Sequence, residues 1–338
     1  MISVRDADEQ RRFWNASRFD PQTTAGHYES WFQRANHPTR PLAFWIRYTI
    51  FCPRGRPDDA IGELWAVFFD GERGRTIAVK EELPISQCRF SRETLDVTIG
   101  AATMDEASLR GCCSSNGRRI DWTLAYGHGE APLLLLPRAL YAKSLPRAKA
   151  LTGMPNARFD GTLEVDGETV LVDGWRGSQN HNWGSRHTDS YAWGQVAGFD
   201  GADDVFLECS TAQLRFGPFW TPRMSLVVVR AGRDEIALNA LSTSLRSKGR
   251  FGYFDWRIEA ANESARVVVT MEAPREAFVG LAYRNPPGCT KTCLNTKLAT
   301  CTLRVERPAG ERLEWSTRHR AAFEILTDRS DHGIDVVA

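Results

Sequence analysis

The stretch from Asp173 to Trp193 combines side chains that could bind a small molecule and handle a proton. It carries three indoles, at Trp175, Trp183 and Trp193, among neutral groups that donate and accept hydrogen bonds. A wall that is apolar in bulk and polar at a few fixed points is typical of small-molecule sites. Glycines interrupt the stretch and permit bends or close backbone approach. We therefore expect this stretch to line a ligand pocket.

His181 is the candidate in this stretch for relaying a proton or holding a substrate hydroxyl, because neutral imidazole can do either. An equally weighted interpretation is a core histidine whose ring bonds to the backbone. Asp173 could orient His181, act as the acid, or be a turn aspartate before Gly174. We expect His187 to be more exposed and of less interest.

A second aromatic cluster surrounds Glu29, with Tyr28 before it and Trp31 after it. Burial among aromatic rings raises the pKa of a carboxyl group, so Glu29 is a candidate acid. The alternative, which we favour slightly, is a structural glutamate bound to Arg47 or Arg34, with the indole of Trp31 filling a barrel end.

Further side chains are candidates for contacting a ligand without reacting with it. Tyr283 begins a proline-fixed turn rich in polar groups, and Asn295 follows at a distance from which it could reach a pocket mouth. A hairpin connection with solvated lysines is the favoured alternative for this region. The expected substrate-binding residues are Tyr28, Trp31, Gln179, Asn182, Trp183, Trp193, Tyr283 and Asn295.

Several common chemistries leave no signature in the sequence. It has no dinucleotide-binding or P-loop motif, no Gly-x-Ser-x-Gly elbow and no His-Glu-x-x-His pair. Cys289, Cys293 and Cys301 lack Cys-x2-Cys spacing and a nearby histidine, and Cys301 falls on the apolar face of a predicted strand. We therefore expect buried thiols rather than a metal site, and no cofactor.

Charge and composition indicate which kinds of partner and which cellular location to expect. The net charge is +1, from 43 basic and 42 acidic residues, which argues against a dedicated nucleic-acid binder. The charged N-terminus predicts no signal peptide, and the longest apolar run, 131–136, is far shorter than the roughly 20 residues of a membrane span. The eight cysteines lack the spacing of a secreted disulfide scaffold, so we expect a cytoplasmic location.

The segment 137–151 contains basic residues interspersed with leucine and tyrosine. Such a segment could touch an anionic membrane surface while an apolar substrate is loaded. A solvated connector is the favoured alternative, so we expect at most a peripheral membrane contact. The oligomeric state is left open.

The elements that must position these groups are strands. Alternation of apolar and polar residues predicts antiparallel strands at 119–126, 254–260 and 298–305, with further candidates at 42–51, 64–69, 94–99, 204–209, 224–230 and 266–271. Asp-Gly or Asn-Gly pairs at 70, 116, 160, 166 and 200 predict turns. Helix is expected only at 4–13 and, as about one turn, within 137–151.

Many short strands in one chain favour barrels or sandwiches, and a barrel of about eight strands has room for one small ligand. The length is compatible with two domains. We expect an all-β chain with domains at 1–185 and 186–338, and little helix.

Three separated blocks resemble the carotenoid 1,2-hydratase, or hydroxyneurosporene synthase, group. They are GHYESWFQRANHP with AFWIRYTIF (26–38 and 43–51), GWRGSQNHNWGS with YAWGQ (within 161–195), and YRNPPGCTKTCLNTKL (283–298). Tocopherol cyclase, AttH-like proteins and other lipocalin-like proteins share similar blocks. The chain departs from the hydratase pattern before His181, where Trp-Arg-Gly-Ser-Gln replaces an acidic entry.

The resemblance implies two lipocalin-like antiparallel β-barrels packed together around an apolar ligand chamber. It also implies a cofactor-free enzyme or binder for hydrophobic isoprenoid-like or polyketide-like molecules. Members of this superfamily differ in activity, so the fold does not choose the reaction.

We expect an enzyme that protonates a C=C bond and lets water or an internal nucleophile capture the cation. Such chemistry needs a dry chamber, one acid and aromatic faces. Glu29 or Asp173 would be the acid, and His181 would position water or relay its proton. One alternative is a non-catalytic carrier of a hydrophobic small molecule; a weaker one is a purely structural β-protein. The indoles expected at the cation site are Trp31, Trp183 and Trp193.

Overall fold

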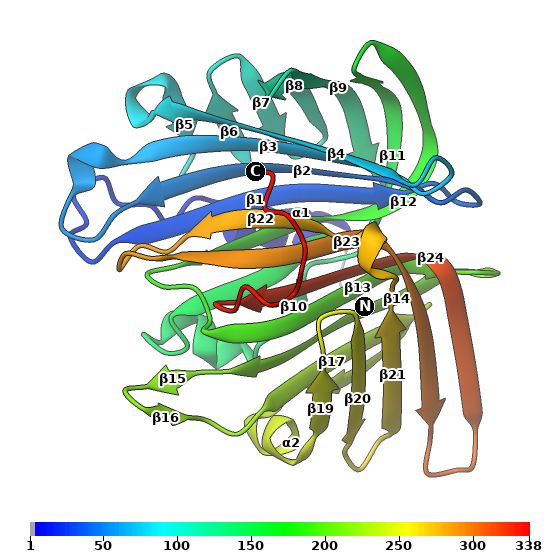
Figure 1. Ribbon diagram of the computed structural model, residues 1–338. Helices are drawn as coiled ribbons and strands as arrows, with labels where there is room; N and C mark the ends of the chain where they lie inside the picture. Colours follow the sequence, from blue (N-terminus) through cyan, green and yellow to red (C-terminus); the bar gives the residue numbers. More distant parts are fainter. Residues whose placement is uncertain (1–3) are drawn as a thin grey trace.

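The computed structural model describes residues 4–338, and strands make up most of this part of the chain (Figure 1). The predicted all-β class is confirmed. Its helices are α1 (Val4–Asn15), close to the predicted helix, α2 (Leu241–Arg246), and the short 3-10 turns η1 (Pro57–Asp59), η2 (Ile85–Gln87), η3 (Arg138–Ala142) and η4 (Arg275–Ala277). Within residues 4–338, no helix has the length and apolar character needed to cross a bilayer.

The first sheet contains the twelve strands of the N-terminal half. They are β1 (His27–Asn36), β2 (Leu42–Cys52), β3 (Ile61–Asp70), β4 (Arg75–Pro84), β5 (Cys88–Phe90), β6 (Asp96–Ile99), β7 (Ala102–Asp105), β8 (Ser108–Ser115), β9 (Arg118–Gly127), β10 (Leu133–Leu134), β11 (Ala148–Val165) and β12 (Glu168–Gly184). They pair antiparallel in the order β4-β3-β2-β1-β12-β11-β9-β8-β7-β6-β5, with β10 beside β11. The β1–β12 pair joins the two aromatic clusters of the sequence, because Trp31 lies opposite His181.

The second sheet contains ten strands of the C-terminal half. They are β13 (Ser190–Phe199), β14 (Ala202–Gln213), β17 (Met224–Ala231), β18 (Asp234–Leu238), β19 (Lys248–Phe251), β20 (Asp255–Ala261), β21 (Arg266–Glu272), β22 (Val279–Arg284), β23 (Thr290–Glu306) and β24 (Arg312–Thr327). Their order is β18-β17-β14-β13-β24-β23-β21-β20-β19, with β22 beside β23. A separate hairpin pairs β15 (Arg215–Phe216) with β16 (Phe219–Trp220). The chain passes between the large sheets at residues 185–189, beside the predicted boundary.

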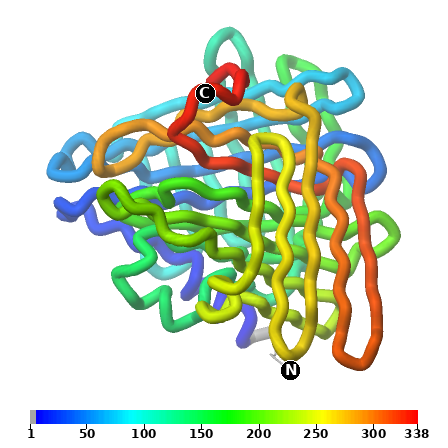
Figure 2. Tube along the Cα trace, turned by 60° about the horizontal axis from the view of Figure 1, so that its bottom comes forward, coloured from blue at the N-terminus to red at the C-terminus, as the bar shows by residue number. Residues whose placement is uncertain are grey.

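The two sheets curl to different degrees. One forms a nearly closed barrel and the other a curled half-barrel. Closure is visible in the first sheet, where β4 faces β8 and the backbone N–H of Ser114 donates to the Glu81 carboxylate at 2.7 Å. In Figure 2 the long yellow and orange hairpins of the second sheet stand upright, across the blue strands of the first. The expected second barrel is therefore an open one.

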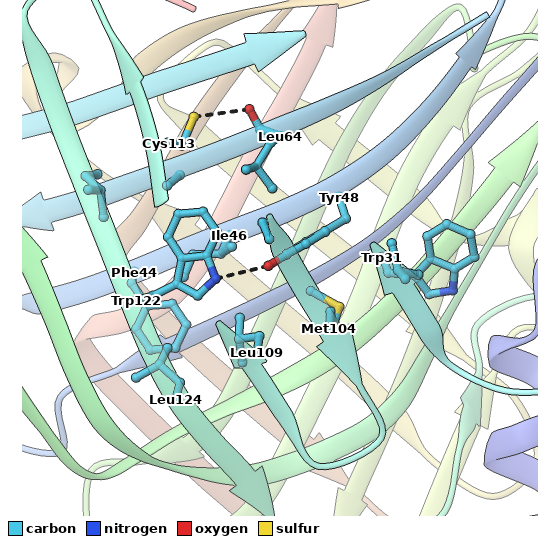
Figure 3. Close-up of a cluster of buried hydrophobic side chains, with 14 of the residues drawn as sticks. Trp31, Phe44, Ile46, Tyr48, Leu64, Met104, Leu109, Cys113, Trp122 and Leu124 are labelled. Atoms are coloured by element: carbon cyan, nitrogen blue, oxygen red, sulfur yellow. Dashed lines mark hydrogen bonds between the residues drawn. The ribbon is translucent and has the colours of Figure 1, made fainter. Parts of the chain in front are cut away.

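Three apolar clusters stabilise this arrangement. The first fills the barrel of the first sheet, where the indole N–H of Trp122 donates to the Tyr48 hydroxyl at 3.0 Å (Figure 3). The second packs on one face of the second sheet, around Trp256 and Phe323. The third, which we call the inter-sheet cluster, lies between the sheets and includes Phe32, Trp45, Trp193, Phe206 and Tyr283. Alternate residues of one strand serve different clusters, because successive side chains point to opposite faces.

Every strand predicted from alternation overlaps an observed strand, and four of the five predicted turns are present at the predicted Gly. The exception is Asp160-Gly161, which lies inside β11 at a bulge. Gly161 has φ +137°, and a Cβ there would lie 2.2 Å from the carbonyl oxygen of Thr123. Glycine is needed at this position for close strand approach and not for a turn.

Candidate active site between the two sheets

A cavity of about 380 Å³ lies between the two sheets. Its wall comes from strands β1, β2, β11 and β12 of the first sheet and β13, β14, β17, β22 and β24 of the second. Much of the wall belongs to the inter-sheet cluster, so it is largely aromatic and aliphatic. A volume of this size is typical of small-molecule sites, which span roughly 300–1,000 Å³.

Side-chain alternation on β1 and β12 divides the predicted site residues between two faces. Tyr28 and Asn182 lie on the cavity wall. Glu29 and Trp31 point the other way, into the first barrel, and Gln179 on the paired strand shares their face. The expected site is therefore split by the sheet that carries it.

Glu29 is fully buried and accepts hydrogen bonds from four groups. The donors are the Ser17 hydroxyl (3.0 Å), the Arg18 backbone N–H (2.8 Å), and ring nitrogens of His27 (3.0 Å) and His181 (2.8 Å). Burial alone would raise the pKa of Glu29, but the bonds and charges of the two histidines outweigh it and lower the pKa to about 2. The expectation of a raised pKa is therefore wrong.

His181 makes hydrogen bonds through both ring nitrogens. Its Nδ1 lies 2.7 Å from the carbonyl oxygen of Trp14, which can only accept, so Nδ1 carries a hydrogen. Its Nε2 lies 2.8 Å from Glu29 Oε1, so a further proton is shared within that pair. The ring also stacks between Trp31, at 4.8 Å, and Trp183, at 4.7 Å. Although His181 borders the cavity, neither nitrogen is free to relay a proton to a ligand.

Asp173 lies far from this group. Its side chain is 76% exposed on β12 and pairs with Arg158 at 3.4 Å. Its position in the strand places it roughly 26 Å from His181, at about 3.3 Å per residue. Asp173 therefore neither orients His181 nor reaches the cavity, contrary to expectation.

Three other predicted residues lie outside the cavity wall. Gln179 and Asn15 bond to each other through both amide groups, at 2.8 and 2.9 Å, which fixes the end of α1. Asn295 is buried on β23 and donates to Glu324 at 3.0 Å. Trp183 is half-buried beside His181. Trp193 and Tyr283 do lie on the wall, together with Tyr28 and Asn182.

Glu208 is a carboxyl group that the sequence interpretation missed. It lies on β14, is 2% exposed and borders the cavity. The Thr152 hydroxyl donates to it at 2.7 Å and the Trp193 indole N–H at 3.2 Å. Burial raises the pKa of Glu208 to about 7, although both hydrogen bonds act to lower it. A signal existed: Glu208 is the one charged residue in the apolar run Val205–Cys209.

A buried polar network stands behind Glu208. The side-chain N–H groups of Gln195 donate to the Thr152 hydroxyl at 3.0 Å and to Asn180 at 2.9 Å. The Gln195 oxygen accepts from Arg34 Nε at 2.9 Å. These bonds hold Thr152, and so orient the Glu208 carboxyl group from behind the wall.

A second polar region of the wall is built around His187. This residue is buried, contrary to expectation, and stacks on Tyr28 with ring centroids 3.8 Å apart. Its Nε2 donates to the carbonyl oxygen of Arg284 at 3.1 Å. Burial lowers the pKa of His187 to about 3, so the ring is neutral at pH 7 and Nδ1 keeps its lone pair.

Arg47 also lies on the wall and is 4% exposed. Its guanidinium group lies 4.4 Å from the ring of Tyr283 and 5.9 Å from that of Trp45. Among residues 4–338 it has no ion pair and no side-chain hydrogen bond, and its Nε is buried without a partner. The expected alternative pairing of Glu29 with Arg47 or Arg34 is not present.

Comparisons with known proteins support the fold. No protein-family model matches the chain. The uncharacterized protein Rv0493c of Mycobacterium tuberculosis is 25% identical over 278 residues, which cover 81% of this chain and 80% of the relative.

Three solved structures are similar along most of their length. Kievitone hydratase from Nectria haematococca has TM-score 0.56 at 12% identity, covering 97% of this chain and 93% of its own. An AttH-like protein of Nitrosomonas europaea has TM-score 0.54 at 10% identity, covering 92% and 97%. CghA with Sch210972 has TM-score 0.56 at 11% identity, covering 91% and 89%. The chain therefore has an AttH-like, lipocalin-type fold.

Proposed function

We propose that this protein is an enzyme that protonates a C=C bond of a hydrophobic substrate held between its two sheets. Water or an internal nucleophile then captures the cation, which gives hydration or cyclisation. The observation that carries this proposal is Glu208, a buried carboxyl group on an aromatic wall whose pKa is raised to about 7. A general acid works best when its pKa lies near the operating pH.

Glu208 gives up one proton in the reaction and regains one, so no other acid or base is required. Its carboxyl group gives a proton to one alkene carbon and becomes a carboxylate. Addition of water to the neighbouring cationic carbon, or attack by a hydroxyl of the substrate, releases one proton, which the carboxylate takes back. The aromatic wall excludes bulk water until the cation forms, and each aromatic face contributes roughly 0.5–2 kcal/mol towards a desolvated cation.

Two further groups have roles in this proposal. The indole of Trp193 holds Glu208 through its N–H and presents an aromatic face in the same region. His187, neutral with a lone pair on Nδ1, accepts a hydrogen bond from the attacking water or hydroxyl. Asp173 does not reach the cavity and has no role in this proposal. Catalytic roles for Glu29 and His181 stay predictions, and the geometry favours Glu208 over both.

The name of one structural neighbour, kievitone hydratase, supports this reaction class. A second neighbour, CghA, was solved with the small molecule Sch210972, which supports a ligand site in this fold. We extend the proposal to isoprenoid-like or polyketide-like substrates because the wall is long and apolar. A specific relation to carotenoid hydratases or tocopherol cyclases stays a prediction that rests on the three sequence blocks.

The test uses the purified protein with a lipid extract of its host cell in oxygen-labelled water, beside Glu208→Gln and Glu29→Gln. A compound that gains labelled water with wild type and Glu29→Gln, and not with Glu208→Gln, supports hydration. A retention shift without a mass change under the same pattern supports cyclisation. Equal turnover by Glu208→Gln would remove Glu208 from the mechanism.

The second candidate function is a non-catalytic carrier of a hydrophobic small molecule. Two observations favour it: both ring nitrogens of His181 are already hydrogen-bonded, so they cannot relay a proton, and the apolar wall is sufficient to bind a ligand. It predicts that one lipid stays bound to the wild-type protein, with no chemical change, and that Glu208→Gln binds it equally well.

A further inference from the structure

Arg47 is a buried cation that makes no ion pair within residues 4–338. Two carboxylates act on its charge from nearby, those of Glu63 and Glu324. Glu63 is paired with Lys80 at 2.9 Å, and Glu324 with Lys297 at 2.7 Å. Both carboxylates are therefore engaged with lysines, whereas the guanidinium group of Arg47 faces the cavity.

Burial lowers the pKa of Arg47, but the groups around it, Glu63 and Glu324 among them, outweigh burial and raise the pKa, so the guanidinium group stays charged. It nevertheless makes no ion pair and no side-chain hydrogen bond in the part of the chain that the structure describes, and buried donors without partners are costly. Buried cations are usually paired, as Lys297 is: it forms an ion pair with Glu324 and donates a hydrogen bond to Asn295 at 2.6 Å. The guanidinium group of Arg47 contacts the rings of Tyr283 and Trp45 instead. Arg47 thus presents a guanidinium group to the cavity without a protein anion bound to it, so a bound ligand is the remaining source of an ion-pair partner.

We propose that the natural ligand carries a carboxylate that binds to Arg47. A planar guanidinium matches such an oxygen pair through two parallel N–H donors. Tyr28 and Tyr191 line the same region, and their hydroxyls make no hydrogen bond within residues 4–338. Burial raises the pKa of both, so these hydroxyls stay protonated and can donate.

This inference deepens the proposed function, on which it rests for the statement that the substrate occupies this cavity. Glu208 and Arg47 belong to different regions of the wall. Arg47 contacts Trp45 on β2 and Tyr283 on β22, whereas Glu208 bonds to Thr152 on β11 and Trp193 on β13. An acidic head at Arg47 would therefore place an apolar chain along the wall with a C=C bond towards Glu208.

The test measures binding alone, so its result does not depend on turnover. The probes are the fluorescent fatty acid cis-parinaric acid and its methyl ester, titrated into wild type, Arg47→Met and Arg230→Met as a control outside the cavity. We expect wild type and the control to bind the acid at least about tenfold more tightly than the ester, and Arg47→Met to lose this preference while still binding the ester.

Equal affinity of wild type for acid and ester, binding of neither, or a preference that survives in Arg47→Met would overturn the proposal. If Arg47→Met does not fold, wild type is titrated with long-chain carboxylates and their amides, where equal affinity overturns it. Failure of Glu208→Gln to lose turnover would refute the proposed acid and leave these binding results unaffected.

An independent observation concerns the surface around the cavity mouth. Three segments meet there, residues 137–150, 214–223 and 240–250, and each contributes to the cavity wall. They contain six of the ten large apolar side chains that are exposed in the described chain. These six, between 46% and 75% exposed, are Leu145, Phe216, Phe219, Trp220, Leu241 and Leu245.

The charge of the same three segments is entirely positive. They contain no Asp or Glu, although the whole chain has 43 basic and 42 acidic residues. Their exposed basic side chains are Arg138, Lys143, Arg147, Arg215, Arg223, Arg246, Lys248 and Arg250. Figure 1 shows the β15–β16 hairpin and α2 at the same lower end of the molecule.

We infer that this mouth docks on an anionic lipid bilayer. Exposed aromatic and leucine side chains enter the boundary between headgroups and acyl chains, and basic side chains bind anionic headgroups. Leu145, Phe216 and Leu241 belong both to the exposed patch and to the cavity wall, so an apolar molecule could pass from bilayer to cavity without crossing water. A second copy of the chain fits less well, because two like-charged patches repel.

The test is co-sedimentation with vesicles of phosphatidylcholine alone or mixed with phosphatidylglycerol. We expect binding to the mixed vesicles that weakens in high salt, and a loss of at least about tenfold in Phe219→Ser/Trp220→Ser and in Arg215→Glu/Arg223→Glu. Leu171→Ser, which removes a side chain 67% exposed on β12, is the matched control and should bind as wild type does.

Absence of binding to the mixed vesicles, or equal binding by the hairpin variants, would overturn the inference. So would a dimer of the free protein that dissociates in Phe219→Ser/Trp220→Ser, because the patch would then be an interface between copies. These variants change exposed side chains, so their thermal unfolding should match that of wild type.

Discussion

Glu29 and Glu208 are both buried, at 0% and 2% exposure, yet their carboxyl groups have opposite properties. Glu29 accepts hydrogen bonds from four groups, two of them histidines, and its pKa is lowered to about 2. Glu208 accepts from two neutral donors, and its pKa is raised to about 7. Burial raises the pKa of both carboxyl groups. In Glu29 the bonds and charges of His27 and His181 outweigh burial, whereas in Glu208 the two neutral donors do not.

The two glutamates also serve different neighbours. Glu29 holds the segment that follows α1 through the Arg18 backbone N–H, and His181 holds the last turn of α1 through the Trp14 carbonyl group, both against the first barrel. Glu208 faces the cavity. Glu29 therefore stabilises the fold, whereas Glu208 is placed where a ligand in the cavity could contact it.

The largest effect should come from Glu208→Gln. The amide keeps the shape of the side chain but cannot donate a proton as an acid, so we expect turnover to fall by about 10²–10⁴-fold. The measurement is the rate on the compound identified in the labelled-water experiment. Affinity for that compound should change little, and a parallel loss of binding would point to misfolding instead.

Glu29→Gln should reverse this pattern. It removes a carboxylate from two histidines and two other donors, so we expect roughly 2–4 kcal/mol less stability in urea unfolding. The rate per folded molecule should stay near that of wild type. If the rate falls as far as in Glu208→Gln while stability is unchanged, the distinction between the two glutamates is wrong.

The pH dependence should separate the two groups further. Glu208 has a raised pKa, so its stabilisation is complete below 4.5 and is lost as the pH rises through about 7, by roughly 3 kcal/mol in total. Its protonated form is also the active acid, so the rate should fall over the same rise. Glu29 has a lowered pKa, and its stabilisation is lost only as the pH falls from 4.5 towards 2. In urea unfolding, Glu208→Gln should lack the first dependence when the pH is varied from 5 to 8. It should keep the second dependence when the pH is lowered from 4.5 towards 2.

The smallest effect should come from Trp193→Phe. This change removes the N–H that lowers the pKa of Glu208 but keeps an aromatic face. We expect the descending limb of the pH–rate profile to move to higher pH by about one unit or less. A shift to lower pH would contradict the assigned hydrogen bond.

Much of the fold could be predicted from the sequence because alternation is a local property. Each predicted strand was present, and the block 173–193 does border the cavity through Asn182, His187 and Trp193. Alternation could not show which face of a buried strand points into the first barrel and which points towards the cavity between the sheets. Residues 28–36 are buried on both faces, so no polar side marks the barrel interior.

The missed acid has a similar cause. The residues on either side of Glu208 in the sequence, Leu207 and Cys209, are not aromatic, and its partners Thr152 and Trp193 come from other strands. The predicted acids, in contrast, were chosen because aromatic residues flank them in the chain. In a sheet, the chemical surroundings of a side chain come mainly from the strands on either side and from the opposing sheet, which adjacency in sequence does not reveal.

The position of the cavity between two separately packed sheets has a consequence for how such a site can vary. The barrel core and the core of the half-barrel do not depend on the cavity wall, since each has its own apolar cluster. Substitutions in the inter-sheet cluster can therefore reshape the chamber while both scaffolds keep their packing. This separation lets the range of accepted molecules diverge between relatives faster than the architecture that holds them.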